Sequence, residues 1–237
     1  MHVLVIVPTY DEVENIENII KAVRSLGYDI LVVDDASPDG TGAIADEHAA
    51  TDAGVRVLHR PQKTGLGPAY AAGFALGLEL GYDILCEMDA DFSHTPSDLT
   101  RLVAAVESGA DLAVGSRYVS GGSTEDWPWY RKAISQGGNT YARMMLGLTI
   151  KDATSGFRAF RDTTIRKIDP STCKSSGYGF QVEMAWRTES AGLDITEVPI
   201  TFRDRLYGES KMNARIAIEA MALVTRWGIE RRVGRHS

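Results

Sequence analysis

Residues 86–94 read CEMDADFSH and place two carboxylates, Asp89 and Asp91, directly after an apolar segment. Residues 84–88 have the length and composition of a buried β-strand. Short strands that are apolar on both faces are typical of a parallel sheet covered by helices. The two acids therefore stand where the chain leaves the sheet, and open α/β sheets bind their ligands at that edge.

The segments around this strand alternate regularly between strand and helix. The apolar runs predict strands at residues 3–7, 30–33, 55–58, 84–88 and 112–115, and the helical periodicities predict helices at residues 14–26, 41–50, 66–80 and 96–107. This order predicts a Rossmann-like α/β fold, with a mostly parallel central sheet flanked by helices.

The second half of the chain is less regular. We expect a polar loop at residues 119–132, helices at 130–146 and 180–191, strands at 156–160 and 195–202, and an irregular loop at 203–213. A C-terminal amphipathic helix is expected at residues 213–232. The sequence thus divides into one large domain, residues 1–212, and a basic helix with its tail, residues 213–237.

Polar residues gather at the carboxyl ends of the predicted strands. They are Pro8 to Glu12, Asp34 with Asp35, Asp89 to Asp91, and Gly115 to Arg117. In a parallel sheet these ends meet at one crevice. Two carboxylates spaced D-x-D repel a diphosphate unless a divalent cation lies between them, and Mg²⁺ or Mn²⁺ prefers such oxygen ligands. The alternative is that Asp89 or Asp91 merely caps a helix.

Two other phosphate-binding motifs do not fit. GLGPAY at residues 65–70 has Tyr70 where a dinucleotide fingerprint has its third glycine, and it follows the third strand. No P-loop pattern occurs. Arginine suits bidentate phosphate recognition, so Arg117, Arg131, Arg205 and Lys211 are candidate phosphate ligands, with solvated surface cations as the alternative. Arg131 begins a helix, where a cation opposes the helix dipole and has no structural motive. His94 is either a catalytic residue or a polar loop residue.

Composition limits the possible partners and the compartment. The 237 residues carry a net charge of −7, which argues against nucleic acid as a partner. The last 25 residues, in contrast, hold five arginines against two glutamates, which suggests contact with an anionic surface or a solvated helix face. Two cysteines do not form a disulfide framework, and no apolar run reaches the ~18 residues that cross a bilayer. We therefore expect a cytoplasmic protein that lies peripherally at the cytoplasmic face of the membrane and has no transmembrane segment.

Eight sequence blocks, in order, resemble the polyprenol (dolichol) phosphate mannosyltransferases of glycosyltransferase family two. They are VPTYDEVENI, VVDDASPDGT, GLGPAYAAGF, MDADFSHTP, GSRY, SGFRAF, GYGFQVEM and RLYGESKM, and the resemblance runs over about residues 3–212. The D-x-D pattern alone indicates only a nucleotide-sugar transferase; the combination is much more specific. The resemblance implies a GT-A fold and a metal-dependent, inverting glycosyltransferase.

The resemblance also implies roles for individual residues. Pro8, Tyr10 and Glu12 would line the nucleoside pocket opposite Val33 and Asp35; Asp89, Ala90 and Asp91 would meet the sugar and diphosphate; and Arg117, Arg131, Arg205 and Lys211 would bind phosphates of donor and acceptor. The expected catalytic residues are Asp89, Asp91 and Arg117. Asp91 would be the main metal ligand, with Asp89 beside it, and Ser93 would bind the metal directly or through a water.

The expected reaction moves mannose from GDP-mannose to a polyprenyl phosphate and releases GDP. The alternatives are another donor such as UDP-glucose, a saccharide acceptor, or a nucleotide-sugar-binding protein without turnover. A phosphate acceptor is a dianion at neutral pH and needs no general base, whereas a hydroxyl acceptor needs a positioned carboxylate. The lipid acceptor implies contact with a membrane surface, through the C-terminal helix or through a membrane partner protein. As an alternative, that helix simply packs on its own domain.

Overall fold

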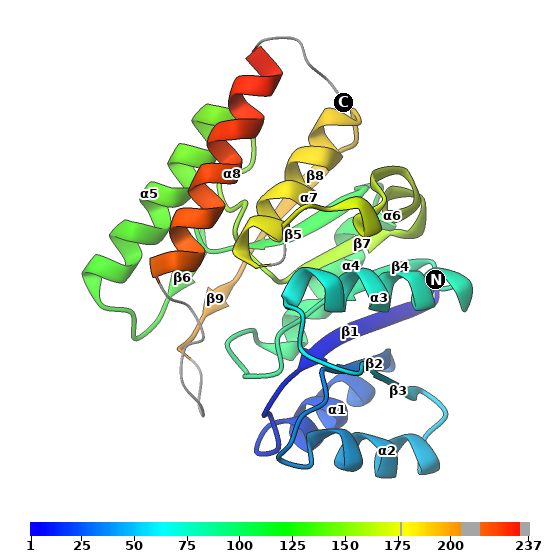
Figure 1. The fold of residues 1–237 in the computed structure, drawn as a ribbon. Helices are drawn as coiled ribbons and strands as arrows, with labels where there is room; N and C mark the ends of the chain where they lie inside the picture. The colour runs from blue at the N-terminus through cyan, green and yellow to red at the C-terminus, as the bar shows by residue number, and fades with distance from the viewer. Residues whose placement is uncertain (176, 205–213, 233–237) are drawn as a thin grey trace.

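The computed structural model describes residues 1–175, 177–204 and 214–232. Within them, a seven-stranded sheet runs in the order β3-β2-β1-β4-β7-β5-β8 (Figure 1). Its strands are β1 (Val3–Thr9), β2 (Asp29–Asp34), β3 (Val55–His59), β4 (Ile84–Glu87), β5 (Leu112–Ser116), β7 (Arg158–Arg161) and β8 (Ile195–Pro199). Only β7 runs antiparallel to its neighbours, so the predicted, mostly parallel sheet is confirmed.

Helices cover both faces of this sheet. One face carries α1 (Ile16–Ser25), α2 (Thr41–Thr51) and α4 (Leu99–Glu107), which follows the 3₁₀ turn η1 (Pro96–Asp98). The other carries α3 (Leu66–Glu79), α6 (Asp162–Ile168) and α7 (Tyr178–Ser190), with a second 3₁₀ turn, η2 (Pro170–Thr172), between α6 and α7. In α1, for example, Ile16, Ile19, Ile20 and Val23 recur at helical spacing and are all buried. The helix–sheet contacts form two apolar cores, one on each face.

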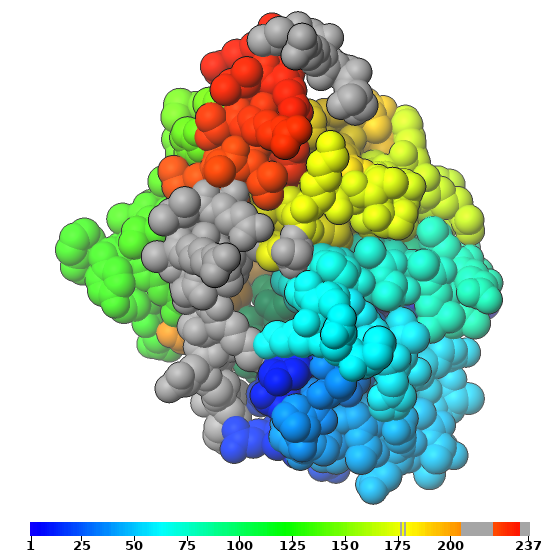
Figure 2. Space-filling view, in the orientation of Figure 1, coloured from blue at the N-terminus to red at the C-terminus, as the bar shows by residue number. Residues whose placement is uncertain are grey.

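Two long helices lie side by side at one end of the molecule (Figures 1 and 2). They are α5 (Trp129–Leu146) and α8 (Ala214–Arg232), and both pack with α7 around a third apolar cluster. Trp227 of α8 stacks on Trp186 of α7, with ring centroids 5.7 Å apart, and Val224 is buried beside them. The described apolar stripe of α8 therefore packs on its own protein.

The structure differs from the sequence prediction at three points. The expected strand at 195–202 ends at Pro199, the last residue in register with β5; β9 (Thr201–Phe202) then pairs with β6 (Ser123–Thr124) in a separate two-stranded sheet. The sequence analysis missed β6. It also missed α6, whose seven residues are too few to show a periodicity.

The carboxyl ends of β1, β2 and β4 lie next to one another at the same edge of the sheet. Thr9 at the end of β1 is paired with Asp34 at the end of β2, and Ile6 of β1 is paired with Glu87 at the end of β4. The loops that carry the predicted acids leave the sheet at this edge, so the edge positions the candidate site.

Candidate active site

Asp34 and Asp35, at the carboxyl end of β2, have different partners. Asp34 accepts hydrogen bonds from the Thr9 hydroxyl at 3.1 Å and from the Ser37 hydroxyl at 2.6 Å, so it holds the turn after β2. Asp35 instead pairs with Arg60, with 2.7 Å between Nη1 and Oδ1. Burial raises the pKa of Asp35, and the nearby charge of Arg60 opposes that rise. Asp35 is therefore the acid of this pair that is suited to a ligand.

Val33 and Pro8, two residues of the predicted nucleoside pocket, lie on neighbouring strands. The side chain of Val33 is 0% exposed and belongs to the core beneath α3, so a contact from this residue to a ligand would come from its main chain. Pro8, its paired neighbour on β1, is half-buried.

Tyr10 and Glu12 occupy the loop between β1 and α1. The ammonium of Lys63 lies 3.8 Å from the centroid of the Tyr10 ring, a cation–π contact. Glu12 accepts a hydrogen bond from the Asn15 side chain at 3.0 Å, and its main-chain oxygen accepts from the amide of Ile16 at the start of α1. The Tyr10 ring and the Lys63 ammonium thus lie together, and the charge of Lys63, like that of Arg60, opposes the rise in the pKa of Asp35.

The loop of Asp89, Ala90 and Asp91 is tightly constrained. Phe92 adopts a left-handed backbone with φ of 58°, which turns the chain back so that the Ser93 amide donates to Asp91 Oδ1 at 3.0 Å. Ala90 and Asp91 are buried, whereas the side chain of Asp89 is 37% exposed. The two carboxylates of this loop therefore differ in their exposure to solvent.

The donor set fits a hard divalent cation. The Ser93 hydroxyl is buried and makes no hydrogen bond to any described residue, so a metal ion or its water would satisfy it. In the part of the chain that the structure describes, no three His, Cys, Asp or Glu side chains gather as a metal cage. Mg²⁺ and similar ions are commonly held by one or two carboxylates plus substrate phosphates, which suits Asp91 and Asp89. These residues would hold the metal together with a diphosphate.

His94 packs inside the protein against the loop of Asp89. It is 2% exposed, stacks on Phe157 at 4.7 Å between ring centroids, and its Nδ1 lies 3.5 Å from the main-chain amide of Asp89. Burial lowers the pKa of His94 to about 4, so the ring is neutral at physiological pH. A neutral ring that accepts from the Asp89 amide is suited to positioning the loop.

Arg117 does not present its guanidinium fork to a ligand as the sequence analysis expected. Nε and Nη2 bind the two carboxylate oxygens of Asp152 at 2.7 and 2.6 Å, and Nη2 also donates to Thr154 at 2.8 Å. Arg117 is 9% exposed and Asp152 is 0% exposed. The bidentate geometry predicted for a phosphate is used on a buried carboxylate inside the protein. The prediction that Arg117 grips a phosphate with both arms of its fork is therefore corrected.

Arg131 has structural partners that the sequence did not reveal. Its guanidinium lies 4.3 Å from the centroid of the Trp127 ring and forms an ion pair with Asp204 at 2.9 Å. The premise that this cation lacks a structural motive is wrong. Its side chain is nevertheless 34% exposed, and the ion pair is therefore open to exchange for a ligand phosphate. Arg205 and Lys211 lie outside the described residues, so their predicted roles stay predictions.

Four contributing residues escaped the sequence analysis: Arg60, Lys63, Trp127 and Asp152. Arg60 directly follows β3, and its place at a strand end was a usable signal. Asp152 offered no signal, because its partner Arg117 is 35 residues away and nothing local marks the pair.

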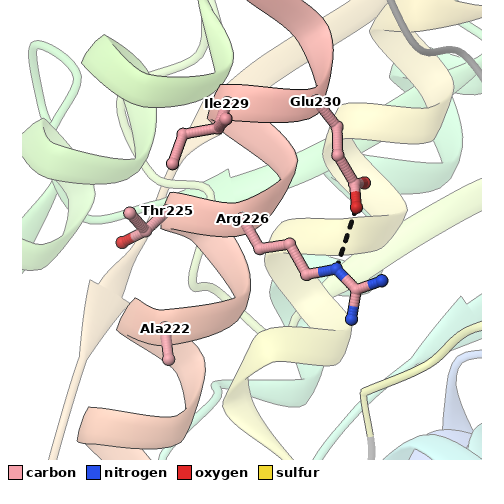
Figure 3. A pocket seen from close by; sticks show the side chains of 5 residues that line it. All are labelled: Ala222, Thr225, Arg226, Ile229 and Glu230. Atoms are coloured by element: carbon pink, nitrogen blue, oxygen red, sulfur yellow. Dashed lines mark hydrogen bonds and ion pairs between the residues drawn. The ribbon is translucent and has the colours of Figure 1, made fainter.

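A separate shallow groove of about 510 Å³ lies on α8 and is lined by Ala222, Thr225, Arg226, Ile229 and Glu230 (Figure 3). Arg226 pairs with Glu230 across one turn at 2.8 Å. All five residues come from one helix, and none of them was predicted as a site residue. The groove is a feature of the helix surface and carries no part of the acidic site.

Comparisons with known proteins identify the family of the chain. The family model described as Glycosyl transferase family 2 matches residues 4–169. The chain is 54% identical over 234 residues to an undecaprenyl-phosphate mannosyltransferase of Micrococcus luteus, covering 98% of this chain and 96% of that protein. It is 52% identical over 235 residues to a polyprenol monophosphomannose synthase of Mycolicibacterium smegmatis, covering 98% and 89%.

A solved structure shares the fold. Glucosyl-3-phosphoglycerate synthase from Mycobacterium tuberculosis, in complex with Mn²⁺, UDP and glucosyl-3-phosphoglycerate, superimposes with a TM-score of 0.69. The match covers 100% of this chain and 81% of that chain at 20% sequence identity. At this identity the likeness concerns the fold alone.

Proposed function

The chain belongs to glycosyl transferase family 2, and we propose that it transfers mannose from GDP-mannose to a polyprenyl monophosphate, with inversion at the anomeric carbon. The products are polyprenyl phosphate mannose and GDP. The observation that carries this proposal is the identity of 52–54%, over 98% of the chain, with two polyprenyl-phosphate mannosyltransferases. The acids at three neighbouring strand ends supply a site for the donor.

The nucleoside of the donor would lie over Tyr10 and Lys63, beside Asp35. A carboxylate accepts hydrogen bonds from the edge of a guanine, which offers adjacent N–H donors. The diphosphate would lie at Asp89 and Asp91. A divalent ion held there by Asp91, with Asp89 and Ser93 beside it, supplies charge neutralisation for the diphosphate leaving group; either Mg²⁺ or Mn²⁺ suits these ligands.

The acceptor phosphate needs positioning rather than deprotonation. With a second pKa near 6, a phosphate monoester is already a dianion at neutral pH. One of its oxygens attacks the anomeric carbon, the bond from that carbon to the diphosphate oxygen breaks, and the electron pair leaves with GDP. Arg131 would hold the acceptor phosphate after exchanging its ion pair with Asp204. Glu87, the nearest acid along β4, is 0% exposed and cannot act as a base on a hydroxyl acceptor.

A transfer assay tests the proposal directly. Radiolabelled GDP-mannose and UDP-glucose are offered separately, with polyprenyl phosphate and Mn²⁺ or Mg²⁺, and the lipid product is extracted. We expect label in the lipid phase from GDP-mannose only. Label from UDP-glucose alone would assign another donor, and donor breakdown with a saccharide but not with the lipid phosphate would assign another acceptor.

We propose that the lipid substrate is met through the outer face of α5. Trp129, Tyr130, Ile134 and Met144 are apolar side chains exposed by 81%, 55%, 65% and 65%. Tryptophan and tyrosine favour the boundary between membrane and water. Arg131 lies on the first turn of the same helix, so an apolar face and a phosphate ligand stand next to each other. This neighbourhood suits a substrate whose hydrocarbon chain lies in the membrane and whose phosphate lies at the membrane surface.

The basic end of α8 makes a second contribution to this membrane contact. Arg231 and Arg232 are exposed, and the Arg231 guanidinium packs against Gly147 at the end of α5. Each cation near an anionic surface contributes about 1 kcal/mol. No described helix is long and apolar enough to pass through a bilayer. We therefore expect the protein to reach its lipid substrate by binding to the membrane surface through α5 and α8.

Vesicle co-sedimentation tests this placement. Exchanging Trp129 and Ile134 together for glutamate should remove most binding, because it puts charge on the apolar face. Leu80→Glu is the matched control, since Leu80 is also an exposed apolar residue, at 45%, but lies beyond the end of α3. Arg231→Ser with Arg232→Ser should weaken binding to anionic vesicles only.

Equal binding of the double glutamate variant and the parent protein would contradict the placement on α5. Equal binding of the parent protein to neutral and anionic vesicles would remove the role of the arginines. No vesicle binding by the parent protein would mean that a separate membrane protein delivers the enzyme.

A further inference from the structure

A layer of buried polar side chains lies beneath the loop of Asp89. Tyr70 of α3, Glu87 of β4 and Arg158 of β7 are 0% exposed, and Gln181 of α7 is 2% exposed. Glu87 and Arg158 are direct partners in the antiparallel ladder between β4 and β7. Glu87 also precedes Asp89 by two residues. The proposed reaction assigns no task to any of these four side chains.

Arg158 fixes the geometry of this layer. Its guanidinium donates to the main-chain oxygens of Ala153, Ser155 and Gln181, each at 2.8 Å. The first two oxygens lie just before Gly156, and the third lies in the first turns of α7. One buried side chain thus connects α7 to the segment around Gly156. The acidic side chain of Glu87, on the neighbouring strand, favours the positive charge of Arg158.

The side-chain amide of Gln181 is unusual within this layer. Both its nitrogen and its oxygen are buried without a hydrogen bond to any described residue. It lies close enough to Glu87 to lower the pKa of that carboxyl, although the two side chains make no hydrogen bond of good geometry. A buried polar group left without a partner costs about 1–3 kcal/mol. Glu87, whose two carboxylate oxygens are likewise without a partner among the described residues, is one acceptor near this amide, and Asp89 on the other side of Gly156 is a second.

Gly156 separates this amide from the active-site carboxylate. The point where a Cβ at Gly156 would lie is 3.7 Å from Gln181 Nε2 and 3.9 Å from each carboxylate oxygen of Asp89. Because residue 156 is glycine, no side chain of that residue occupies the space near both the amide and the carboxylate. The amide is buried and Asp89 is 37% exposed, so the amide approaches the carboxylate from the protein side and a ligand approaches from the solvent side.

We propose that Gln181 is a positioning residue for Asp89, donating a hydrogen bond from its amide across Gly156 to the Asp89 carboxylate when the donor is bound. Arg158 holds Gln181 in place through its main chain. The bond orients the carboxylate and satisfies the buried amide. The inference rests on the proposed function, because it takes Asp89 as a ligand of the sugar-diphosphate.

The first test replaces Gln181 by methionine, which has a similar length and no hydrogen-bonding amide. Residues that orient a ligating carboxylate typically contribute about 10- to 100-fold, so kcat with GDP-mannose should fall in that range while the KM for the lipid phosphate stays unchanged. The melting temperature should stay the same or rise, since an unpaired buried amide is removed. Thr188→Val, a buried polar change on the same helix, is the control expected to leave kcat unchanged.

The second test asks whether Gln181 acts through Asp89. In an Asp89→Asn background, Gln181→Met should change Mn²⁺-dependent binding of GDP-mannose, measured by calorimetry, by less than about twofold, because coupled residues are not additive. Gly156→Ala should reproduce the effect of Gln181→Met. Its methyl group would lie at ordinary contact distance from both the amide and the carboxylate, and we expect it to hinder their approach.

Additive losses in the double variant would overturn the inference, and so would an unchanged kcat for Gln181→Met. A fall in kcat that tracks a lower melting temperature would reduce Gln181 to a packing residue. Absence of mannose transfer by the parent protein would instead refute the proposed function. The binding cycle with nucleotide and Mn²⁺ would still decide the link between Gln181 and Asp89.

Discussion

Asp91→Ala is expected to lower kcat for mannose transfer by about a thousandfold or more. A metal ion at a leaving group supplies several kcal/mol of stabilisation to the transition state, and each 1.36 kcal/mol is a factor of ten in rate. Asp91 is the buried acid of the loop, and its Oδ1 is already oriented by the Ser93 amide. Without it, the charge that develops on the diphosphate has no compensation.

Single-turnover kinetics with saturating donor measure this effect on the chemical step. EDTA should abolish the activity of the parent protein, and Mg²⁺ or Mn²⁺ should restore it. Asp98→Ala is the matched control, because Asp98 lies in η1 nearby and pairs with the surface residue Arg101. Full activity of the parent protein in chelator, or of the Asp91 variant in metal, would show that Asp91 holds no essential metal.

Asp152→Ala should produce the largest loss of stability among the changes considered. Removing one partner of a buried ion pair leaves the other charge uncompensated and costs about 3–5 kcal/mol. Asp152 is fully buried and binds both Nε and Nη2 of Arg117 as well as its main-chain amide. For a chain of this length, such a loss lowers the melting temperature by roughly 10 °C.

Calorimetric melting curves check this expectation. Arg117→Lys should also destabilise, because an ammonium cannot replace the fork. Asp204→Ala is the matched control: its partner Arg131 is half-exposed, and exposed pairs contribute only about 0–1 kcal/mol. Combining Asp152→Leu with Arg117→Met should recover stability, since an apolar pair can replace a buried ionic one. An equal effect of the Asp152 and Asp204 changes would mean that burial does not decide the strength of these pairs.

The sequence predicted the parallel strands of the sheet well, and for a local reason. Each strand from β1 to β5 is a short apolar run followed by polar residues, so its bounds and its carboxyl end are written into consecutive residues. Parallel topology then forces these ends to one edge, which brings Asp35 and the loop of Asp89 and Asp91 together. Local pattern and general topology were sufficient there.

The tertiary structure alone decided what the cations do. Arg117 was predicted to bind phosphate because it ends a strand, but its guanidinium binds the carboxylate of Asp152. Arg131 stacks on Trp127 and forms an ion pair with Asp204. The bond of Arg158 to Gln181, which places an amide across Gly156 from Asp89, has no sequence signal either. The physical reason is common to all three cases. An apolar run needs only a core to enter, whereas a charge needs one particular partner at about 3 Å, and folding brings that partner from a distant part of the chain.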